Sequence, residues 1–177
     1  IKAGTPIIPL YIWSPSEAGG WAPGAASKWF LHQALKSLDR QWIKRGGKLV
    51  LRQGDSLAEL RKIINDTGAE RVFWNRRYEP PQREIDVSIK SALRDDGTEV
   101  KSFNSSLLNE PHSVSTGSGK PYKVYTPYWR KVKDRDLPGL VHSDLSQIKH
   151  PKSYPQSLIL DELKLISTDQ LHDNCLL

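Results

Sequence analysis

Segments with strand character and segments with helix character alternate along the chain up to Phe103, and this alternation constrains the fold more than any other feature. Short runs rich in aliphatic, β-branched and aromatic residues predict strands at 7–13, 49–51, 71–75 and 99–103. Between these runs, apolar residues recur at helical spacing over 25–45, 55–67 and 80–95. This order predicts an α/β domain with a parallel sheet, helices on both faces and right-handed crossovers, which is a Rossmann-like arrangement.

The ends of the predicted helices carry their own signals. Gly46-Gly47 follows a basic last turn and is expected to stop the first helix. Asp55 is expected to cap the second helix, which ends at Thr67-Gly68. Pro80-Pro81 opens the third helix, where the missing N–H of proline costs nothing.

The regular alternation stops after Asn104. A loop rich in Ser and Gly occupies 110–121, and helical character returns at 127–133. The stretch from Asp136 onward alternates proline-broken loop with leucine-rich pieces, and it shows no obvious partner inside the chain. We therefore expect an α/β domain over 1–135, followed by an irregular linker over 136–177.

Positive charge is concentrated in a segment that follows the predicted sheet. The whole chain has 26 Lys and Arg against 20 Asp and Glu, a formal charge of +6. The stretch 120–135 carries six cations against Asp134 alone, with tyrosines and a tryptophan interleaved. Such a run is typical of solvated surface, and it is also the pattern by which proteins contact phosphate. Both interpretations stay open at this point.

The sequence shows no catalytic or metal-binding constellation. Cys175 is the single cysteine, and the five histidines have no metal-ligand spacing. Adjacent carboxylates occur as Asp95-Asp96 and Asp161-Glu162, which suit surface or capping positions. We therefore expect neither a catalytic residue nor a metal site in this chain.

Composition also limits where the protein acts. The apolar runs are far shorter than the ~20 residues of a membrane helix. No signal peptide is recognisable, so we expect a cytoplasmic protein. The chain contains no Met and opens with Ile1, which indicates a fragment of a longer protein.

Five blocks of sequence, taken in order, resemble the DNA photolyase/cryptochrome family. The block at 73–80 resembles the family's "WNRRYEP" turn, and the block at 119–130 resembles its "G-x-P-Y-x-V-[FY]-T-P-[FY]-W" stretch. The other three resemble the family's second strand, second helix and fourth-helix region, and they lie at 8–15, 24–31 and 103–111. The likeness is greatest to bacterial photolyases that repair cyclobutane pyrimidine dimers.

This resemblance implies a light-driven DNA repair lyase, a deoxyribodipyrimidine photolyase that splits such dimers with blue light. The chain would be the amino-terminal antenna domain, inactive alone, and flavin adenine dinucleotide (FAD) would bind in a helical domain absent from this sequence. The family's opening strand is absent as well. Because that strand is central in the family's sheet, between 7–13 and 71–75, we expect an incomplete sheet. A cryptochrome-type blue-light photoreceptor and a generic nucleotide-binding α/β module are the alternatives.

The resemblance also places an antenna chromophore at the carboxyl edge of the sheet, where parallel α/β sheets hold ligands. Methenyltetrahydrofolate is favoured over deazaflavin by family frequency. The residue patterns by which the family binds each of these two chromophores are both broken in this sequence. An empty pocket is the other alternative. The residues that we expect to line one pocket at this edge are Tyr11, Trp13, Trp21, Asn75, Arg77 and Glu79. Packing against helices is the alternative role of the aromatic residues, and an ion pair with each other is the alternative role of Arg77 and Glu79.

The basic stretch acquires a specific role in the same context. We expect Lys123, Arg130, Lys131 and Lys133 to contact DNA or to shape the interface with the flavin domain. The full-length protein is expected to bind damaged DNA as a monomer, with no membrane involved.

Overall fold

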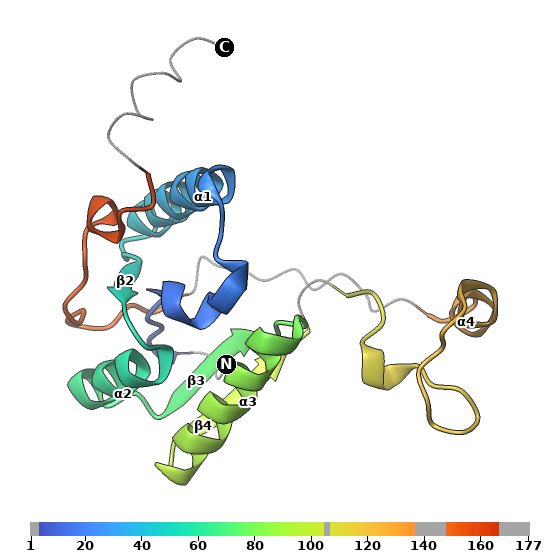
Figure 1. Cartoon of the computed structure of the whole chain (residues 1–177). Coiled ribbons are helices and arrows are strands. Elements are labelled where there is room, and N and C mark those ends of the chain that lie inside the picture. The colour runs from blue at the N-terminus through green and yellow to red at the C-terminus, as the bar shows by residue number, and fades with distance from the viewer. Residues whose placement is uncertain (1–3, 105–106, 137–147, 167–177) are drawn as a thin grey trace.

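The structure is a computed structural model that describes residues 4–104, 107–136 and 148–166 (Figure 1). Its first strands and helices alternate in the predicted order, as β1 (Leu10–Trp13), α1 (Ala25–Ile43), β2 (Val50–Gln53), α2 (Ser56–Thr67), β3 (Arg71–Asn75), α3 (Pro80–Asp95) and β4 (Glu99–Phe103). A 3-10 helix, η1 (Pro15–Trp21), lies between β1 and α1. After β4 come the 3-10 helix η2 (Pro111–Ser113), the helix α4 (Tyr125–Val132) and the 3-10 helix η4 (Leu160–Leu163). The predicted α/β class is confirmed.

α2 and α3 begin, and α2 ends, where local signals in the sequence indicate. The Asp55 carboxylate accepts a hydrogen bond from the Ala58 amide at 2.8 Å and so caps α2. Gly68 ends the same helix at a φ of 65°, a left-handed conformation that favours glycine. Pro80 is the first residue of α3, as its missing N–H allows. Each signal acts within a few residues of chain, so the sequence alone is sufficient to predict these boundaries.

The strands pair in two separate halves, each made of two parallel strands. β1 pairs with β2, with Leu10 opposite Val50. β3 pairs with β4, with Arg71 opposite Glu99. β1 and β3 do not pair with each other, so the sheet is incomplete at the place where the family's central strand is expected. The prediction of an incomplete sheet is confirmed.

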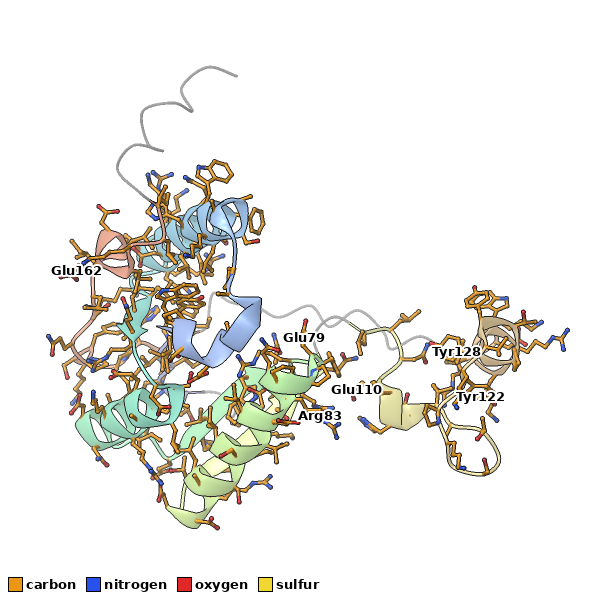
Figure 2. The ribbon with its side chains drawn as sticks, in the orientation of Figure 1. Glu79, Arg83, Glu110, Tyr122, Tyr128 and Glu162 are labelled. Atoms are coloured by element: carbon orange, nitrogen blue, oxygen red, sulfur yellow. The ribbon has the colours of Figure 1, made fainter. Side chains whose placement is uncertain are left out.

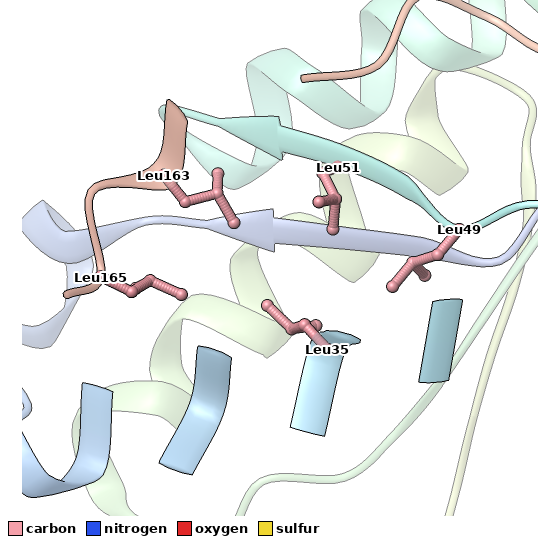
Figure 3. Packing of buried hydrophobic residues seen from close by; sticks show 5 residues of the cluster. All are labelled: Leu35, Leu49, Leu51, Leu163 and Leu165. Carbon is pink, nitrogen blue, oxygen red and sulfur yellow. The ribbon is translucent and has the colours of Figure 1, made fainter. Parts of the chain in front are cut away.

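Each half of the sheet has its own apolar core, because different elements pack against each pair of strands. On the β3–β4 half, Ile89 and Leu93 of α3 pack with Val100 of β4. On the β1–β2 half, the buried residues are leucines from α1, from β2 and the residue before it, and from the carboxyl-terminal part of the chain. Figure 3 shows these side chains: Leu35, Leu49, Leu51, Leu163 and Leu165.

Residues 148–166, which we call the strap, belong to the β1–β2 half. Leu163 and Leu165 are only 1% and 4% exposed. The strap also meets the outer edge of β2, where the Leu158 amide donates to the Leu51 carbonyl oxygen at 2.9 Å. On the same edge, the Leu51 amide donates to the Ser157 hydroxyl oxygen at 2.9 Å. The unpaired edge of β2 is thereby covered, as exposed strand edges usually are.

The expectation that the carboxyl-terminal stretch has no partner inside the chain is therefore wrong for residues 148–166. The leucine-rich piece at 158–165 is too short and too irregular to show helical or strand periodicity, so its burial depends on contacts distant in sequence. The remaining residues of the predicted linker, 137–147 and 167–177, lie outside the described residues.

His150 joins the start of the strap to the end of α1. Its Nε2 atom donates to the Arg45 carbonyl oxygen at 2.8 Å, because a carbonyl can only accept. Its Nδ1 atom then accepts from the Tyr154 hydroxyl at 3.1 Å, and its ring lies edge-on to Trp42. Gly47 provides the space, since a Cβ atom there would lie 2.5 Å from the His150 Cε1 atom. A glycine is required at position 47 because the His150 ring approaches the backbone too closely for a side chain.

α1 buries only part of the apolar residues that recur along it at helical spacing. Leu35 is buried against the β1–β2 half, whereas Trp29 and Leu38 are 40% and 42% exposed. Phe30 is 69% exposed. The reason is that α1 has the sheet and the strap on one side alone, so only one ridge of its apolar residues is covered.

Residues 107–136, which we call the lobe, stand apart from the α/β body (Figure 1, yellow to orange). The lobe contains η2 and α4. α4 begins at Tyr125, two residues before its predicted start, with Pro127 in its first turn. Proline is tolerated there because the first N–H groups of a helix have no partner within the helix.

Candidate functional site

A slot of about 920 Å³ separates the two halves of the sheet. Leu10 and Ile12 of β1 line it, together with Val72 and Trp74 of β3. The slot follows the neighbouring edges of β1 and β3, and neither of these edges has a strand paired to it. Within the described residues, the buried Trp74 Nε1 atom finds no acceptor. A long apolar slot between two unpaired strand edges suits a further strand better than a small ligand.

Two of the six predicted pocket residues line the carboxyl end of this slot. Asn75 is the last residue of β3, and Arg77 follows it by two positions. Arg77 forms its ion pair with Asp86 of α3, whose Oδ1 atom lies 3.0 Å from Nε and 2.5 Å from Nη2. The predicted alternative, an ion pair between Arg77 and Glu79, is therefore replaced by a bond that holds Arg77 against α3.

Tyr11 and Trp13 point to a different environment from Asn75 and Arg77. Both pack against the leucine core of the β1–β2 half, because alternate residues of a strand face opposite sides of the sheet. Burial raises the pKa of the Tyr11 hydroxyl, and the charge of Arg77 opposes this shift. Tyr11 therefore lies within electrostatic reach of Arg77, while its ring contributes to the core.

The two remaining pocket residues flank the same edge of the sheet. Glu79 is exposed and precedes α3, and its carboxylate accepts a hydrogen bond from the Tyr78 amide at 3.1 Å. Trp21 is the last residue of η1, and its side chain lies outside the described part of the structure. Figure 2 shows Glu79 at the start of α3 with Arg83 nearby on the same helix.

A carboxylate that sequence reasoning missed occupies the amino terminus of α2. Glu17 of η1 accepts hydrogen bonds from the Ser56 amide at 2.7 Å and from the Ser56 hydroxyl at 2.9 Å. The Ser14 hydroxyl donates to the Gly54 carbonyl oxygen at 2.6 Å and so joins β1 to the same turn. A helix amino terminus favours negative charge, and here the chain's own carboxylate supplies it. A residue 39 positions away in sequence gives no local signal of this contact.

A second missed cluster lies where the lobe meets the α/β body, and Figure 2 shows Glu110 at this point. The Glu110 carboxylate accepts a hydrogen bond from the Tyr78 hydroxyl at 2.7 Å and pairs with the Arg76 guanidinium. These two donors hold the pKa of Glu110 below its usual range, while partial burial opposes the shift. Arg76 also donates to the Ser102 carbonyl oxygen at 3.0 Å, so the cluster connects the ends of β3 and β4 to the lobe.

The predicted basic residues all lie in the lobe. Lys123 precedes α4, Arg130 and Lys131 lie on it, and Lys133 follows it. All four are exposed, and Lys133 has an ion pair with Asp134 at 3.7 Å. They are therefore available to a partner at the surface.

Among the described residues, no group of three or more His, Cys, Asp or Glu side chains could hold a metal ion. His32 is buried on α1, where burial lowers the pKa of its imidazole. His142, His172 and Cys175 lie outside the described part of the chain. No described helix is long and apolar enough to cross a membrane.

Comparison with known proteins decides the family. Residues 1–149 match the family model of DNA photolyase. This chain belongs to the DNA photolyase family. The match therefore extends beyond the short motifs and covers most of this photolyase-family chain.

Two curated relatives show both branches of the DNA photolyase family. The deoxyribodipyrimidine photo-lyase of Agrobacterium fabrum is 42% identical over 168 residues, which cover 95% of this chain and 34% of the relative. Cryptochrome-1 of Arabidopsis thaliana is 35% identical over 132 residues, which cover 74% of this chain and 19% of the relative. The photolyase-family chain therefore spans a minor part of the length of each.

One solved structure agrees with this assignment, and a second shares the fold. The crystal structure of a bacterial class III photolyase from Agrobacterium tumefaciens matches with a TM-score of 0.84 and 43% identity, covering 93% of this chain and 34% of that chain. An archaeal photolyase from Sulfolobus tokodaii, described with two FAD molecules and a novel light-harvesting cofactor, matches with a TM-score of 0.66. At 18% identity, the archaeal match concerns the fold alone, with 90% of this chain and 35% of that chain covered.

Proposed function

We propose that this chain is the antenna part of a deoxyribodipyrimidine photolyase, which splits cyclobutane pyrimidine dimers in DNA with blue light. The observation that carries the proposal is the 42% identity to the Agrobacterium fabrum photo-lyase over 95% of the chain. The match in fold to the class III photolyase, with a TM-score of 0.84, supports it. FAD and the reacting groups belong, in this proposal, to the part of a longer protein that this sequence does not include.

The domain division forms part of the same proposal. Residues 1–135 form the antenna domain, and 136–177 lead toward a helical flavin-binding domain. The strap belongs to this second stretch, yet it packs on the β1–β2 half before the chain continues. The connection to the flavin domain is therefore anchored on the antenna domain along β2.

The antenna chromophore is proposed to bind at the carboxyl edge of the sheet, with Tyr11, Trp13, Trp21, Asn75, Arg77 and Glu79 around it. Among these residues, Asn75 and Arg77 line the slot, and Glu79 keeps an exposed carboxylate beside them. Arg77 is paired with Asp86, and Trp13 packs against the leucine core. The described side chains are therefore only in part available to contact a flat ring. Methenyltetrahydrofolate is the chromophore that we favour over deazaflavin.

An absorption spectrum of the full-length protein as purified tests the pocket. We expect a near-ultraviolet band beyond that of the flavin, and we expect Trp21→Ala or Glu79→Ala to remove it. Phe30→Ala, which removes an exposed aromatic ring from α1, is the control and should leave the band intact. A spectrum of flavin alone, unchanged by the two pocket substitutions, would reduce these residues to structural roles.

The cations of the lobe are proposed to face the DNA backbone or the flavin domain in the full-length protein. Lys131 and Lys133 are exposed, so reversing their charge removes phosphate contacts without disturbing a core. The double substitution to Glu should weaken binding to damaged and undamaged DNA alike and flatten the dependence of affinity on salt. A loss confined to damaged DNA would contradict a contact with the backbone.

A dimer-cleavage assay on the full-length protein under blue light tests the enzymatic function directly. Repair of dimer-containing DNA supports the photolyase, and its absence favours a cryptochrome-type photoreceptor, to which the identity with Cryptochrome-1 of Arabidopsis thaliana points. The 177-residue chain mixed with flavin, the same DNA and light should repair nothing. Repair by this chain alone would show that the reacting groups lie within it.

A further inference from the structure

The segment between β1 and α1, residues 14–24, contains little that would order it by itself. It includes three glycines and two prolines and no strand or α-helix. η1 covers 15–21, but Gly19 interrupts this 3-10 helix with a φ of 53°, a left-handed value that favours glycine. We call residues 14–24 the edge loop, because it follows the carboxyl end of β1. Its order must come from contacts with other elements.

Two side chains tie the edge loop to the turn between β2 and α2. Ser14, directly after β1, donates to the Gly54 carbonyl oxygen at 2.6 Å. Glu17 accepts from the Ser56 amide at 2.7 Å and from the Ser56 hydroxyl at 2.9 Å. Beyond Ser14, no other side chain in the described part of the edge loop has a hydrogen bond to another element. Glu17 is therefore the anchor of this loop.

The environment of Glu17 makes this anchor stronger than a surface contact. Ser56 is the first residue of α2, so its N–H has no acceptor within the helix. A carboxylate is favoured at a helix amino terminus, and hydrogen bonds to a charged acceptor are stronger than neutral ones. Glu17 also lines a cavity of about 180 Å³ with Leu57 of α2 and Ile85 of α3. It is thus held where three elements meet.

Glu17 is not a second cap that α2 could lose without effect on the loop. Asp55 already caps the helix through the Ala58 amide, so α2 keeps its own cap when Glu17 is removed. The edge loop has no such substitute among the described contacts. Loss of Glu17 would extend the unanchored span from 18–24 to 15–24. The main effect of Glu17 should therefore be on the loop rather than on the helix.

The anchor bears on the place of Trp21, the last residue of η1. Trp21 lies midway along the chain between Glu17 and Ala25, where α1 begins. η1 also packs on α3 (Figure 1, blue beside green). The same helix carries Asp86, the partner of Arg77. Glu17 thus holds the edge loop against the element that holds Arg77.

We propose that Glu17 is a positioning residue of the antenna site, and that its bond to the amino terminus of α2 fixes the edge loop and with it the place of Trp21 at the carboxyl edge of the sheet. The inference rests on the proposed function for the role of Trp21 beside a chromophore. Both carboxylate oxygens of Glu17 already accept hydrogen bonds from Ser56, so Glu17 acts through the loop and leaves contact with the chromophore to other residues.

Fluorine NMR of the full-length protein labelled with 5-fluorotryptophan tests this role without any chromophore. Trp21→Phe and Trp42→Phe assign the two resonances that matter. Glu17→Ala should shift and broaden the Trp21 resonance and leave that of Trp42 in place. Ser16→Ala, at an exposed position of η1, is the matched control and should change neither. An unchanged Trp21 resonance in Glu17→Ala would overturn the proposal, and so would an equal change at Trp42, which indicates general loosening.

Two further variants test whether the bond to Ser56 is the cause. Glu17→Gln keeps an oxygen acceptor and loses the charge, so its effect on the Trp21 resonance should be intermediate. Ser56→Ala should add nothing to the effect of Glu17→Ala, because residues that act through one bond are not additive. Additive effects of Glu17→Ala and Ser56→Ala would place the anchor elsewhere and overturn the proposal.

An absorption spectrum of the full-length protein as purified tests the link to the antenna site. Glu17→Ala should lower the ratio of the antenna band to the flavin band at least about tenfold, the order expected when a hydrogen bond to a charged group is lost. Glu84→Gln, at an exposed carboxylate of α3, should leave the ratio intact. An unchanged ratio in Glu17→Ala would overturn the role in the site. A wild-type spectrum without the band would contradict the antenna proposal itself, and the fluorine measurement would then decide whether Glu17 fixes Trp21.

Discussion

Glu110 shows how one side chain can join two parts of this molecule. Its carboxylate is stabilised by the Tyr78 hydroxyl first and by Arg76 second, so the pKa of this carboxyl is lowered in the folded protein. A lowered folded pKa means that the contribution to stability is present above the unfolded value of ~4.3. That contribution is lost as the pH falls through the lowered folded pKa. The junction between lobe and body should therefore weaken in acid.

Tyr78→Phe should raise the pKa of Glu110 toward its usual value. The substitution removes the 2.7 Å hydrogen bond that contributes most to the shift and keeps the ring. A carbon-13 NMR titration of the Glu110 carboxyl carbon in the full-length protein measures this directly. Tyr122→Phe, whose ring contacts Tyr128 in the lobe, is the matched control and should leave the titration unchanged. An unchanged titration in Tyr78→Phe would assign the shift to the neighbouring charges of Arg76 and His112 instead.

Gly47→Ala should destabilise the β1–β2 half by about 1–3 kcal/mol. The new Cβ atom would lie 2.5 Å from the His150 ring and 2.9 Å from the Tyr154 hydroxyl oxygen. Exchange of the Leu35 and Leu51 amides in the full-length protein reports the opening of this half. Gly117→Ala, at a position with nothing within 4 Å, should change little. If the clash is the cause, Gly47→Ala combined with His150→Ala should cost less than the sum of the two substitutions.

At the scale of elements, the strap is a structural part of the β1–β2 half. It covers the outer edge of β2 and contributes Leu163 and Leu165 to a core whose other buried leucines come from α1 and β2. The strap can do this because its Leu158 amide donates to the Leu51 carbonyl oxygen of β2 and its Ser157 hydroxyl oxygen accepts from the Leu51 amide. Its contribution should be visible on truncation of a single side chain.

Leu163→Ala should destabilise the β1–β2 half by about 2–5 kcal/mol, as expected for a fully buried leucine. The same amide-exchange measurement on Leu35 and Leu51 gives the loss. Ile159→Ala, in the same strap but 66% exposed, should stay within about 0.5 kcal/mol. A similar loss for both substitutions would mean that the strap does not pack as described.

At the scale of the whole molecule, the gap in the sheet controls stability. β1 and β3 present unpaired edges to the slot, and each buried N–H or C=O group left without a partner costs about 1–3 kcal/mol. The cores of the two halves are separate, so neither compensates for the other. A strand in the slot would satisfy both edges and join the cores.

The 177-residue chain alone should therefore be poorly stable or aggregate through these edges. Light scattering and thermal unfolding measure this. Ile12→Lys, which places a charge beside the open edge of β1, should reduce aggregation more than Ile43→Lys, which adds the same charge on the exposed surface of α1. A sharp, reversible transition above ~60 °C would contradict the expectation.

The candidate site was only partly predictable from the sequence. Strand order predicts that Asn75 and Arg77 lie at the carboxyl edge of the sheet, because parallel strands bring their carboxyl ends together. The partner of Arg77 does not follow, since Asp86 was hidden among other charges on α3 and Glu79 is closer in sequence. Glu17 and Glu110 were missed for the same reason: neither carries a local pattern that distinguishes it from a surface carboxylate.

The sequence by itself determined the α/β order, the helix boundaries, the family and the position of the gap. Periodicity, capping residues, glycines and motifs are local, and they act within one element whatever the rest of the chain does. Tertiary structure alone decided that the strap completes a core, that Gly47 makes room for His150, and that α4 stands away from the body. Those features depend on contacts between residues far apart in the chain, and such contacts follow from the packing of whole elements rather than from any one segment.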